Sequence, residues 1–462
     1  MITSPQQQIA RTLVEGLGRR TFLRAALGAG AGAALATGTA ASAAATPTSA
    51  TPTSATPTAT AGKGAPGRYA GVLQPGRGRV AGDVYLGSEA DEVLWGYVPS
   101  VHATPVARVR SGGTITIDAV SHEGILEDQG RDPVAWFGER GVARREVLDD
   151  AAAIAAGYSR HERSFDVDGP HVITGPVLVE GAEPGDVLKI ETLETTPRVP
   201  YGVISSRHGK GALARAAGGG APAGIGLAEV MPPVATDGRA TGIPTDYGNV
   251  SVLARIQGDH AVIGAGRSRL RFPLRTFFGT MGVARAENTG LTAPEANSIP
   301  PTLGGGNIDI SQLGPGSAFY LPVAADGALF YVGDPHMAMG DGEVALTAME
   351  GSLRGTFRLT VCKPGSGDAP SVAYSYPFAE TDEAWIPIGL SDPDGSVDGQ
   401  SSDLDVAMRR AVVNALDFLE HDHGIDRAIA YAYLSAAADF VVSQVVDRTV
   451  GVHGLLRKAD LA

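Results

Sequence analysis

Glycine and proline divide this chain into short segments, and this feature restricts its fold more than any other. The 462 residues include 62 glycines and 30 prolines. Glycine favours turns and proline lacks a backbone donor, so both interrupt regular elements. The apolar runs between them are short, and residues 114–117 alternate in the manner of a strand. We therefore expect a mainly β fold, with a β-sandwich-like body and small barrel-like and α+β C-terminal parts.

The N-terminal segment has the composition of a targeting signal and a linker. Adjacent arginines, Arg19 and Arg20, come before a Phe-Leu pair and a long alanine- and glycine-rich run. This pattern is typical of a twin-arginine signal, and a small-residue cleavage site fits at residues 41–43. A membrane anchor is the alternative, although alanine and glycine insert poorly compared with leucine. Residues 46–61 repeat a Thr-Pro-Thr unit, which predicts a semi-extended linker or stalk.

The rest of the chain is expected to form a β-rich body and a C-terminal region of mixed structure. Strands are predicted at residues 173–180, 318–323, 328–332, 342–346 and 357–362, and helices at residues 146–156, 404–420 and 425–439. Asp403 is the expected N-cap of the second helix. A glycine- and alanine-rich stretch, residues 209–243, predicts a long loop or lid. The resulting divisions are a signal at 1–45, a linker at 46–66, a β-rich catalytic body at 67–375 and an α+β region at 376–462.

Charge and cysteine content exclude several kinds of partner and site. The formal net charge of −13 disfavours nucleic acid or an anionic membrane as the main partner, and after signal cleavage we expect no stable membrane insertion. Cys362 is the single cysteine, so the chain can form neither an internal disulfide nor a cysteine zinc cluster. It lies in a predicted strand and is interpreted as a small core residue.

Residues 304–350 combine carboxylates, a histidine and glycines between two apolar runs. Asp334 and His336 stand two apart at the end of a predicted strand, so an extended backbone points both side chains to one side. Asp341 and Glu343 repeat that spacing. A Gly-Asp-Pro turn and a solvated Asp-Gly hairpin turn are the structural alternatives. Together these residues supply the oxygen ligands and imidazole that a water-activating metal site needs.

Two further segments carry candidate residues. Asn307 and Asp309 follow a run of glycines that lets the backbone approach a ligand, although a plain loop with an Asx turn is the alternative. Asp118 and His122 are four apart after a predicted strand, and His171 is a similar but less supported candidate. The chain lacks a Gly-x-Ser-x-Gly elbow and a His-Glu-x-x-His motif, which favours metal-activated water over a covalent mechanism.

Several ordered motifs resemble the acetamidase/formamidase family over most of residues 80–455. They are TGPVLVEGAEPGD at 174–186, GTMGVA at 279–284, GGNID at 305–309, GALFYVGDPHMAMGDGE at 327–343 and QVVD at 444–447. The resemblance implies a β-rich fold, often oligomeric, that hydrolyses short amides with a divalent metal such as zinc. The family is mostly cytosolic, whereas this chain carries an apparent export signal.

These observations lead to one main hypothesis, an exported metal-dependent amidohydrolase that cleaves a formamide- or acetamide-like substrate to carboxylate and ammonia. The expected metal ligands are His122, Asp118, Asp309, Asp334 and His336. Glu343 is the expected general base, Asp341 its support, and Asn307 a donor to the oxyanion. The protein would act outside the cytoplasm, in the periplasm or at the cell surface. The alternatives are a non-catalytic surface-displayed binding protein, or a hydrolase of another C–N or ester bond.

Overall fold

Strands dominate the structure, and the mainly β prediction is confirmed. The computed structural model describes residues 69–206, 210–213, 224–226, 250–287, 290–393 and 402–461, all within one compact unit. The expected signal and linker, and nearly all of the loop expected at 209–243, lie outside these residues. No helix in the described part of the chain has the length and apolar character needed to cross a membrane.

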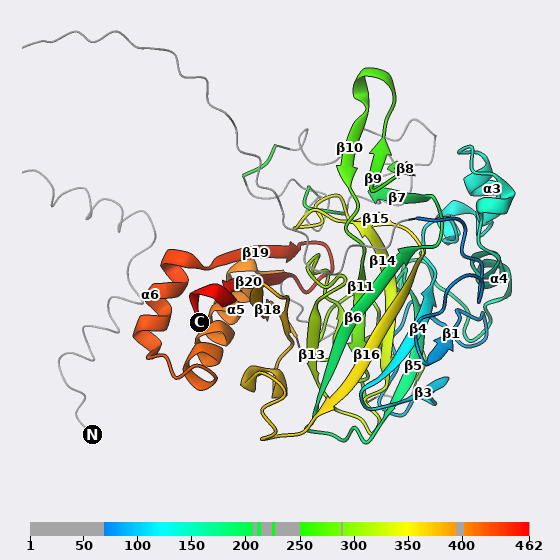
Figure 1. Ribbon diagram of the computed structural model, residues 1–462. Helices are drawn as coiled ribbons and strands as arrows, with labels where there is room; N and C mark the ends of the chain where they lie inside the picture. The colour runs from blue at the N-terminus through cyan, green and yellow to red at the C-terminus, as the bar shows by residue number, and fades with distance from the viewer. Residues whose placement is uncertain are drawn as a thin grey trace, which may run out of the picture. The chain divides into compact units, whose positions relative to one another are not determined.

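One sheet has nine strands in the order β1-β4-β16-β6-β13-β17-β18-β20-β19 (Figure 1). Its strands are β1 (Val84–Leu86), β4 (Gly113–Ala119), β6 (Val187–Pro197), β13 (Ala318–Pro322), β16 (Leu353–Cys362), β17 (Phe378–Glu380), β18 (Ala384–Leu390), β19 (Asp439–Gln444) and β20 (Gly451–Arg457). The last four strands come from the C-terminal region, so that region extends the sheet of the body.

The other sheet has eleven strands, with β10-β9-β8-β7-β15-β14-β11-β12 as its main path and β5 joining β2 and β3 to β14. Its strands are β2 (Leu94–Trp95), β3 (Ala107–Arg110), β5 (Val172–Glu180), β7 (Tyr201–Ser206), β8 (Val250–Gln257), β9 (His260–Ile263), β10 (Leu270–Pro273), β11 (Phe277–Val283), β12 (Gly305–Asn307), β14 (Phe330–Ala338) and β15 (Met349–Glu350). β14 lies at its centre and carries two of the candidate residues.

The two sheets pack through buried aromatic side chains. Phe357 of the nine-stranded sheet lies 5.3 Å from Phe278 and 5.6 Å from Phe330 of the other sheet, measured between ring centroids. All three side chains are fully buried, and Cys362 is buried in the same core, as its place in a strand predicts. Removing aromatic surface of this size from water supplies much of the stabilisation of a sheet-on-sheet core.

The helices are few. They are α3 (Pro133–Gly138), α4 (Asp149–Gly157), α5 (Leu404–His421) and α6 (Arg427–Ala437), with short 3-10 segments at Glu127–Gln129, Arg144–Glu146, Gly266–Ser268, Pro294–Ala296, Ser371–Tyr374 and Lys458–Asp460. Asp403 caps α5 as predicted, since its side chain accepts a hydrogen bond from the Asp405 backbone at 2.8 Å. α5 packs closely on β18 because Gly389 has no side chain: a Cβ there would lie 2.1 Å from the Ala407 carbonyl oxygen.

The strand predicted at residues 342–346 is wrong. This segment is a turn, and Gly342, Glu343 and Leu346 adopt positive φ angles of 98°, 47° and 112°. Positive φ angles are incompatible with a regular strand, so the short alternation here does not form one. The helix predicted from residue 146 begins at Asp149 instead, because residues 144–146 form a separate 3-10 turn.

Candidate metal centre

Strand β14 brings two of the expected ligands together. His336 Nε2 lies 3.0 Å from Asp334 Oδ2. The neighbouring strand β15 adds Glu350, which is the direct cross-strand partner of His336, and His336 Nε2 lies 3.1 Å from Glu350 Oε1. All three side chains are buried. The sheet register, not sequence proximity, therefore places Glu350 beside the pair.

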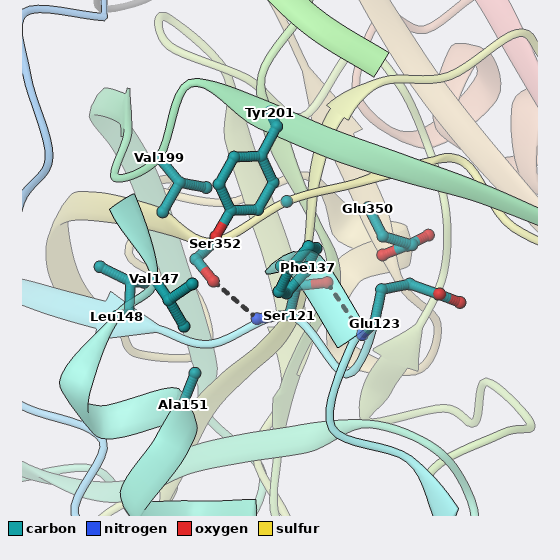
Figure 2. Close-up of a pocket in the computed structure, with 11 residues that line it drawn as sticks. Ser121, Glu123, Phe137, Val147, Leu148, Ala151, Val199, Tyr201, Glu350 and Ser352 are labelled. Carbon is teal, nitrogen blue, oxygen red and sulfur yellow. Dashed lines mark hydrogen bonds between the residues drawn. The ribbon is translucent and has the colours of Figure 1, made fainter. Parts of the chain in front are cut away.

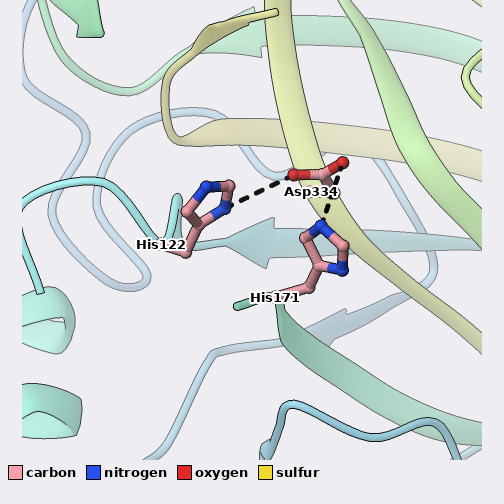
Figure 3. A group of neighbouring side chains, drawn as sticks. All are labelled: His122, His171 and Asp334. Carbon is pink, nitrogen blue, oxygen red and sulfur yellow. Dashed lines mark ion pairs between the residues drawn. The ribbon is translucent and has the colours of Figure 1, made fainter. Parts of the chain in front are cut away.

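Two histidines approach Asp334 from other parts of the chain (Figure 3). His122 follows β4, and its Nδ1 lies 3.5 Å from Asp334 Oδ1. His171 comes directly before β5, and its Nε2 lies 3.6 Å from Asp334 Oδ2. Because β5 pairs with β14, with Ile173 opposite Gly333, the histidine is held against the aspartate.

Asp309 and Gly279 form the other side of this group. Asp309 follows β12, and its Oδ1 lies 3.7 Å from His336 Nδ1. A Cβ built on Gly279 of β11 would lie 2.3 Å from Asp309 Oδ1, 2.6 Å from His336 Cε1 and 2.8 Å from Asp334 Oδ2. Only glycine at position 279 leaves room for these three side chains to lie against strand β11.

Three carboxylates of this group stand on strained backbone. Asp309, Asp334 and Glu343 have φ angles of 47°, 50° and 47°, in the left-handed region that residues other than glycine seldom adopt. Each such residue costs about 1–3 kcal/mol, and strain of this kind gathers at functional sites. The strain turns all three carboxylates toward one group of side chains, at a cost that local packing has to offset.

The chemistry of the group fits a divalent cation. The structure forms three sets whose ligand atoms lie within 4.8 Å of one another: His122, His171 and Asp334; Asp309, His336 and Glu343; and Asp334, His336 and Glu350. Many of these buried atoms have no hydrogen-bond partner among the described residues, including both nitrogens of His336 and both carboxylate oxygens of Asp309. Buried polar atoms are rarely left without partners, so their convergence indicates a site for cations.

Burial and close charges shift the pKa values of this group in opposite directions. Burial raises the pKa of Asp309 to about 6 and that of Glu350 to about 7, and the nearby Asp334 carboxylate adds to both effects. Burial also raises the pKa of Glu343 well above its usual value, and the negative charge of Asp309 adds to this effect. Burial opposes ionisation of Asp334 too, but His171 and His336 hold its pKa well below the usual value.

The pKa values of the histidines are also shifted in opposite directions. Burial lowers the pKa of His171 to about 4, and Asp334 only partly offsets that effect. For His336, burial is outweighed by Glu350 and Asp334, which raise its pKa well above the usual value. Groups whose environments push their pKa values apart are a feature of functional sites.

A cavity of about 670 Å³ opens onto the group. Its walls include the carboxylates Asp334, Glu343 and Glu350, and also Arg163 and Phe165. This volume is within the range of small-molecule sites. The carboxylates are therefore reachable by a ligand, although each is nearly inaccessible to bulk solvent.

Asn307 lines the same cavity with a fixed orientation. The Thr280 hydroxyl donates to Asn307 Oδ1 at 2.7 Å, across the β11–β12 pairing. Because the amide oxygen is occupied, the Nδ2 group is the end available to donate to a ligand oxygen. This orientation suits the role expected for Asn307.

A second, much smaller cavity adjoins Glu123 and Glu350 (Figure 2). Its volume is about 20 Å³, which is enough for about one water molecule. Ser352 Oγ accepts from the Ser121 backbone at 3.0 Å, and Ser121 Oγ accepts from the Glu123 backbone at 3.2 Å. These bonds fix the chain just before and after His122.

The structure places six of the eight expected site residues in or beside this group. They are His122, Asn307, Asp309, Asp334, His336 and Glu343. Asp118 is elsewhere: Arg354 binds its two carboxylate oxygens at 2.6 and 2.7 Å, and Tyr85 donates to it at 2.8 Å. Asp341 is exposed and accepts from Ser311 Oγ at 2.9 Å.

Three residues of the group were not among the expected ligands. His171 stands in an Asp-Gly-Pro-His segment, and Glu350 ends the acidic stretch, so each gave a weak signal in the sequence. Asp447 lies about 100 residues further on, yet burial and its neighbours Asp309 and Glu343 raise its pKa well above the usual value. Gln444 shapes its loop by accepting from the Val446 and Asp447 backbones at 2.9 and 3.1 Å.

The fold and the site define a mainly β protein with a buried centre of carboxylates and imidazoles suited to divalent cations. The model of the Acetamidase/Formamidase family matches residues 267–453, which contain Asp309, Asp334, His336, Glu343 and Glu350. Over this stretch the chain is similar to the acetamidase/formamidase family.

Individual relatives show the same similarity. An acetamidase of Mycolicibacterium smegmatis is 29% identical over 212 residues, 39% of this chain and 51% of that protein. A formamidase of Methylophilus methylotrophus is 26% identical over 298 residues, 56% of this chain and 69% of that protein. The chain thus spans about half the length of the first relative.

Solved structures share the fold. The acetamidase of Bacillus halodurans gives a TM-score of 0.56 at 24% identity, over 81% of this chain and 98% of that chain. An acetamidase of Yersinia enterocolitica gives 0.57 at 23% identity, over 85% of this chain and 96% of that chain. At these identities the likeness shows the fold alone.

Proposed function

We propose that this protein is a metal-dependent amidohydrolase that cleaves a short-chain linear amide to a carboxylate and ammonia. The observation that carries the proposal is the convergence of buried imidazole and carboxylate atoms without hydrogen-bond partners beside a ligand-sized cavity. The match to the family model supports the reaction class, since relatives named acetamidase and formamidase are named for amide hydrolysis.

His122, His171, Asp334, His336 and Glu350 would hold the metal, with Asp309 beside them. When bound, a divalent cation supplies Lewis-acid chemistry, lowering the pKa of water and stabilising negative charge on an amide oxygen. Zinc suits a set of imidazole and carboxylate ligands without cysteine. We propose zinc on this chemical ground.

Glu343 is the proposed general base. It is buried, borders the cavity, and its Oε1 lies 3.9 Å from His336 Nε2. Burial raises its pKa well above the usual value, which makes the ionised carboxylate a stronger base. Glu343 takes a proton from water as the water attacks the amide carbonyl, and returns it to the leaving nitrogen. Asn307 Nδ2 donates to the developing oxyanion.

The substrate is tested with a panel of amides. Ammonia release should be measured from formamide, acetamide, propionamide and butyramide, with the corresponding ethyl esters as competing substrates. The proposal predicts hydrolysis of at least one amide with a higher kcat/KM than its matched ester. Hydrolysis of esters alone would instead assign another reaction, and ligand binding without turnover would assign a binding protein.

Export by the twin-arginine route is a separate proposal, supported by the sequence around Arg19 and Arg20 and by the Thr-Pro repeat after it. Changing both arginines to lysine should keep the protein in the cytoplasm, as seen by cell fractionation. Equal export of the changed and unchanged proteins would contradict the proposal.

A further inference from the structure

We propose that the centre holds two divalent cations, bridged by the Asp334 carboxylate. One cation takes His122, His171 and Asp334, and the other takes Asp334, His336 and Glu350. The inference deepens the proposed function and rests on it in one respect, namely that the cluster binds metal.

The first set surrounds Asp334 on the side of the two histidines (Figure 3). Its nitrogen–oxygen distances are 3.5 Å for His122 and 3.6 Å for His171. Two ligands that are each about 2.0–2.1 Å from a zinc ion in a tetrahedron lie roughly 3.3 Å apart. His122 Nδ1 and Asp334 Oδ1 have no hydrogen-bond partner among the described residues, so both atoms are available to a cation.

The second set surrounds His336 Nε2. This nitrogen lies 3.0 Å from Asp334 Oδ2 and 3.1 Å from Glu350 Oε1, yet neither contact has hydrogen-bond geometry. The nitrogen therefore remains available to a cation. The other ring nitrogen faces Asp309 Oδ1 at 3.7 Å, which is beyond hydrogen-bond distance.

The supply of imidazole nitrogens limits the number of cations bound through histidine to two. A neutral imidazole carries one nitrogen lone pair, so His336 can bind a single cation. Two of the three sets include His336: one adds Asp309 and Glu343, and the other adds Asp334 and Glu350. These two sets therefore compete for the single lone pair of His336. Glu350 is nearer, at 3.1 Å against 3.9 Å for Glu343, which leaves Glu343 as the base. The set with His122 and His171 uses other nitrogens and can be filled at the same time.

The charge of the centre also favours two cations. Five buried carboxylates gather here: Asp309, Asp334, Glu343, Glu350 and Asp447. Histidines form the close ion-pair contacts with Asp309, Asp334, Glu343 and Glu350. Uncompensated buried charge is costly. One divalent cation offsets at most two ionised carboxylates, whereas two cations offset four.

Metal stoichiometry tests the inference without using activity. Full-length protein, cleared of metal, is saturated with zinc, desalted and measured by elemental analysis per chain. We expect two zinc ions in the wild type, one in His171→Gln and one in Glu350→Gln. His161→Gln is the matched control, because Tyr158 and Asp168 already partner both nitrogens of that ring, and it should keep two. Circular dichroism confirms that each variant is folded.

A second readout needs no variant. Wild-type protein loaded with manganese should give the electron paramagnetic resonance signal of a magnetically coupled pair. A wild type that saturates at one ion, an uncoupled manganese signal at saturation, or a folded His171→Gln that still binds two would each overturn the inference. Amide hydrolysis with one ion per chain would refute this inference alone. Two bound ions without hydrolysis of any amide would refute only the proposed function.

Discussion

Gly279 and Asp309 lie so close that a Cβ on the glycine would be 2.3 Å from Asp309 Oδ1. Real Cβ atoms do not approach other heavy atoms to that distance, so an added methyl group has to displace the carboxylate. His336 and Asp334 border the same position, at 2.6 and 2.8 Å. The bare backbone of β11 is thus a structural part of the proposed metal centre.

Gly279→Ala should weaken metal binding and lower kcat/KM by about 10²-fold, since a displacement of about 1 Å in an active site has this effect. Metal content and ammonia release are the measurements. Gly138→Ala is the control, because a Cβ there meets nothing within 4 Å and its φ is not positive. A fully active, fully loaded Gly279→Ala protein would show that the close approach has no functional role.

Glu343→Gln should lower kcat by about 10²–10⁴-fold, the usual contribution of a general base, while metal content stays unchanged. The amide keeps the shape of the carboxylate but cannot accept the proton. Asp341→Asn serves as the comparison, because this exposed residue only accepts a hydrogen bond from Ser311 and should have little effect. Equal losses in both variants would argue against Glu343 as the base.

Asp118→Asn should destabilise the fold by about 3–5 kcal/mol without changing the metal content of the folded protein. Removing one charge of a buried pair leaves its partner uncompensated, and both Arg354 and Arg198 face Asp118 in this position. Urea unfolding and elemental analysis separate the two effects. Loss of metal at unchanged stability would restore Asp118 as a ligand.

His453 should make stability depend on pH below neutrality. Burial lowers its pKa to about 4, against about 6.5 in the unfolded chain, so the unfolded state binds more protons between these values. Its contribution to the free energy of unfolding is complete above about pH 6.5 and is lost as the pH falls toward 4.

His453→Asn removes this titration while its amide can still bond to Ser443, which lies 2.8 Å from Nδ1. Unfolding free energies should be measured in urea at several pH values from 4.5 to 7. The slope of the unfolding free energy against pH should correspond to the uptake of up to about one fewer proton on unfolding than in the wild type. Parallel wild-type and variant curves would contradict the assignment.

Local sequence patterns predicted most of the elements, because alternation, helical periodicity and caps are local properties. The candidate site was predictable where ligands lie close in sequence, as with Asp334 and His336. Asp447 could not be placed this way, because its approach depends on the loop after β19. Asp118 shows the same limit: it stands directly opposite Arg354 across the β4–β16 pairing, which sequence spacing does not reveal.

The most direct test of the account is ammonia release from short amides by the purified protein before chelation, after chelation and after a divalent cation is restored. The account predicts release at the start, loss after chelation, and recovery with zinc or another divalent ion. Glu343→Gln should keep its loss of about 10²–10⁴-fold in kcat even when fully loaded with metal. Undiminished release by metal-free protein, or no release from any amide by metal-loaded protein, would contradict the central claim that this buried centre is a metal-dependent amide-hydrolysing site.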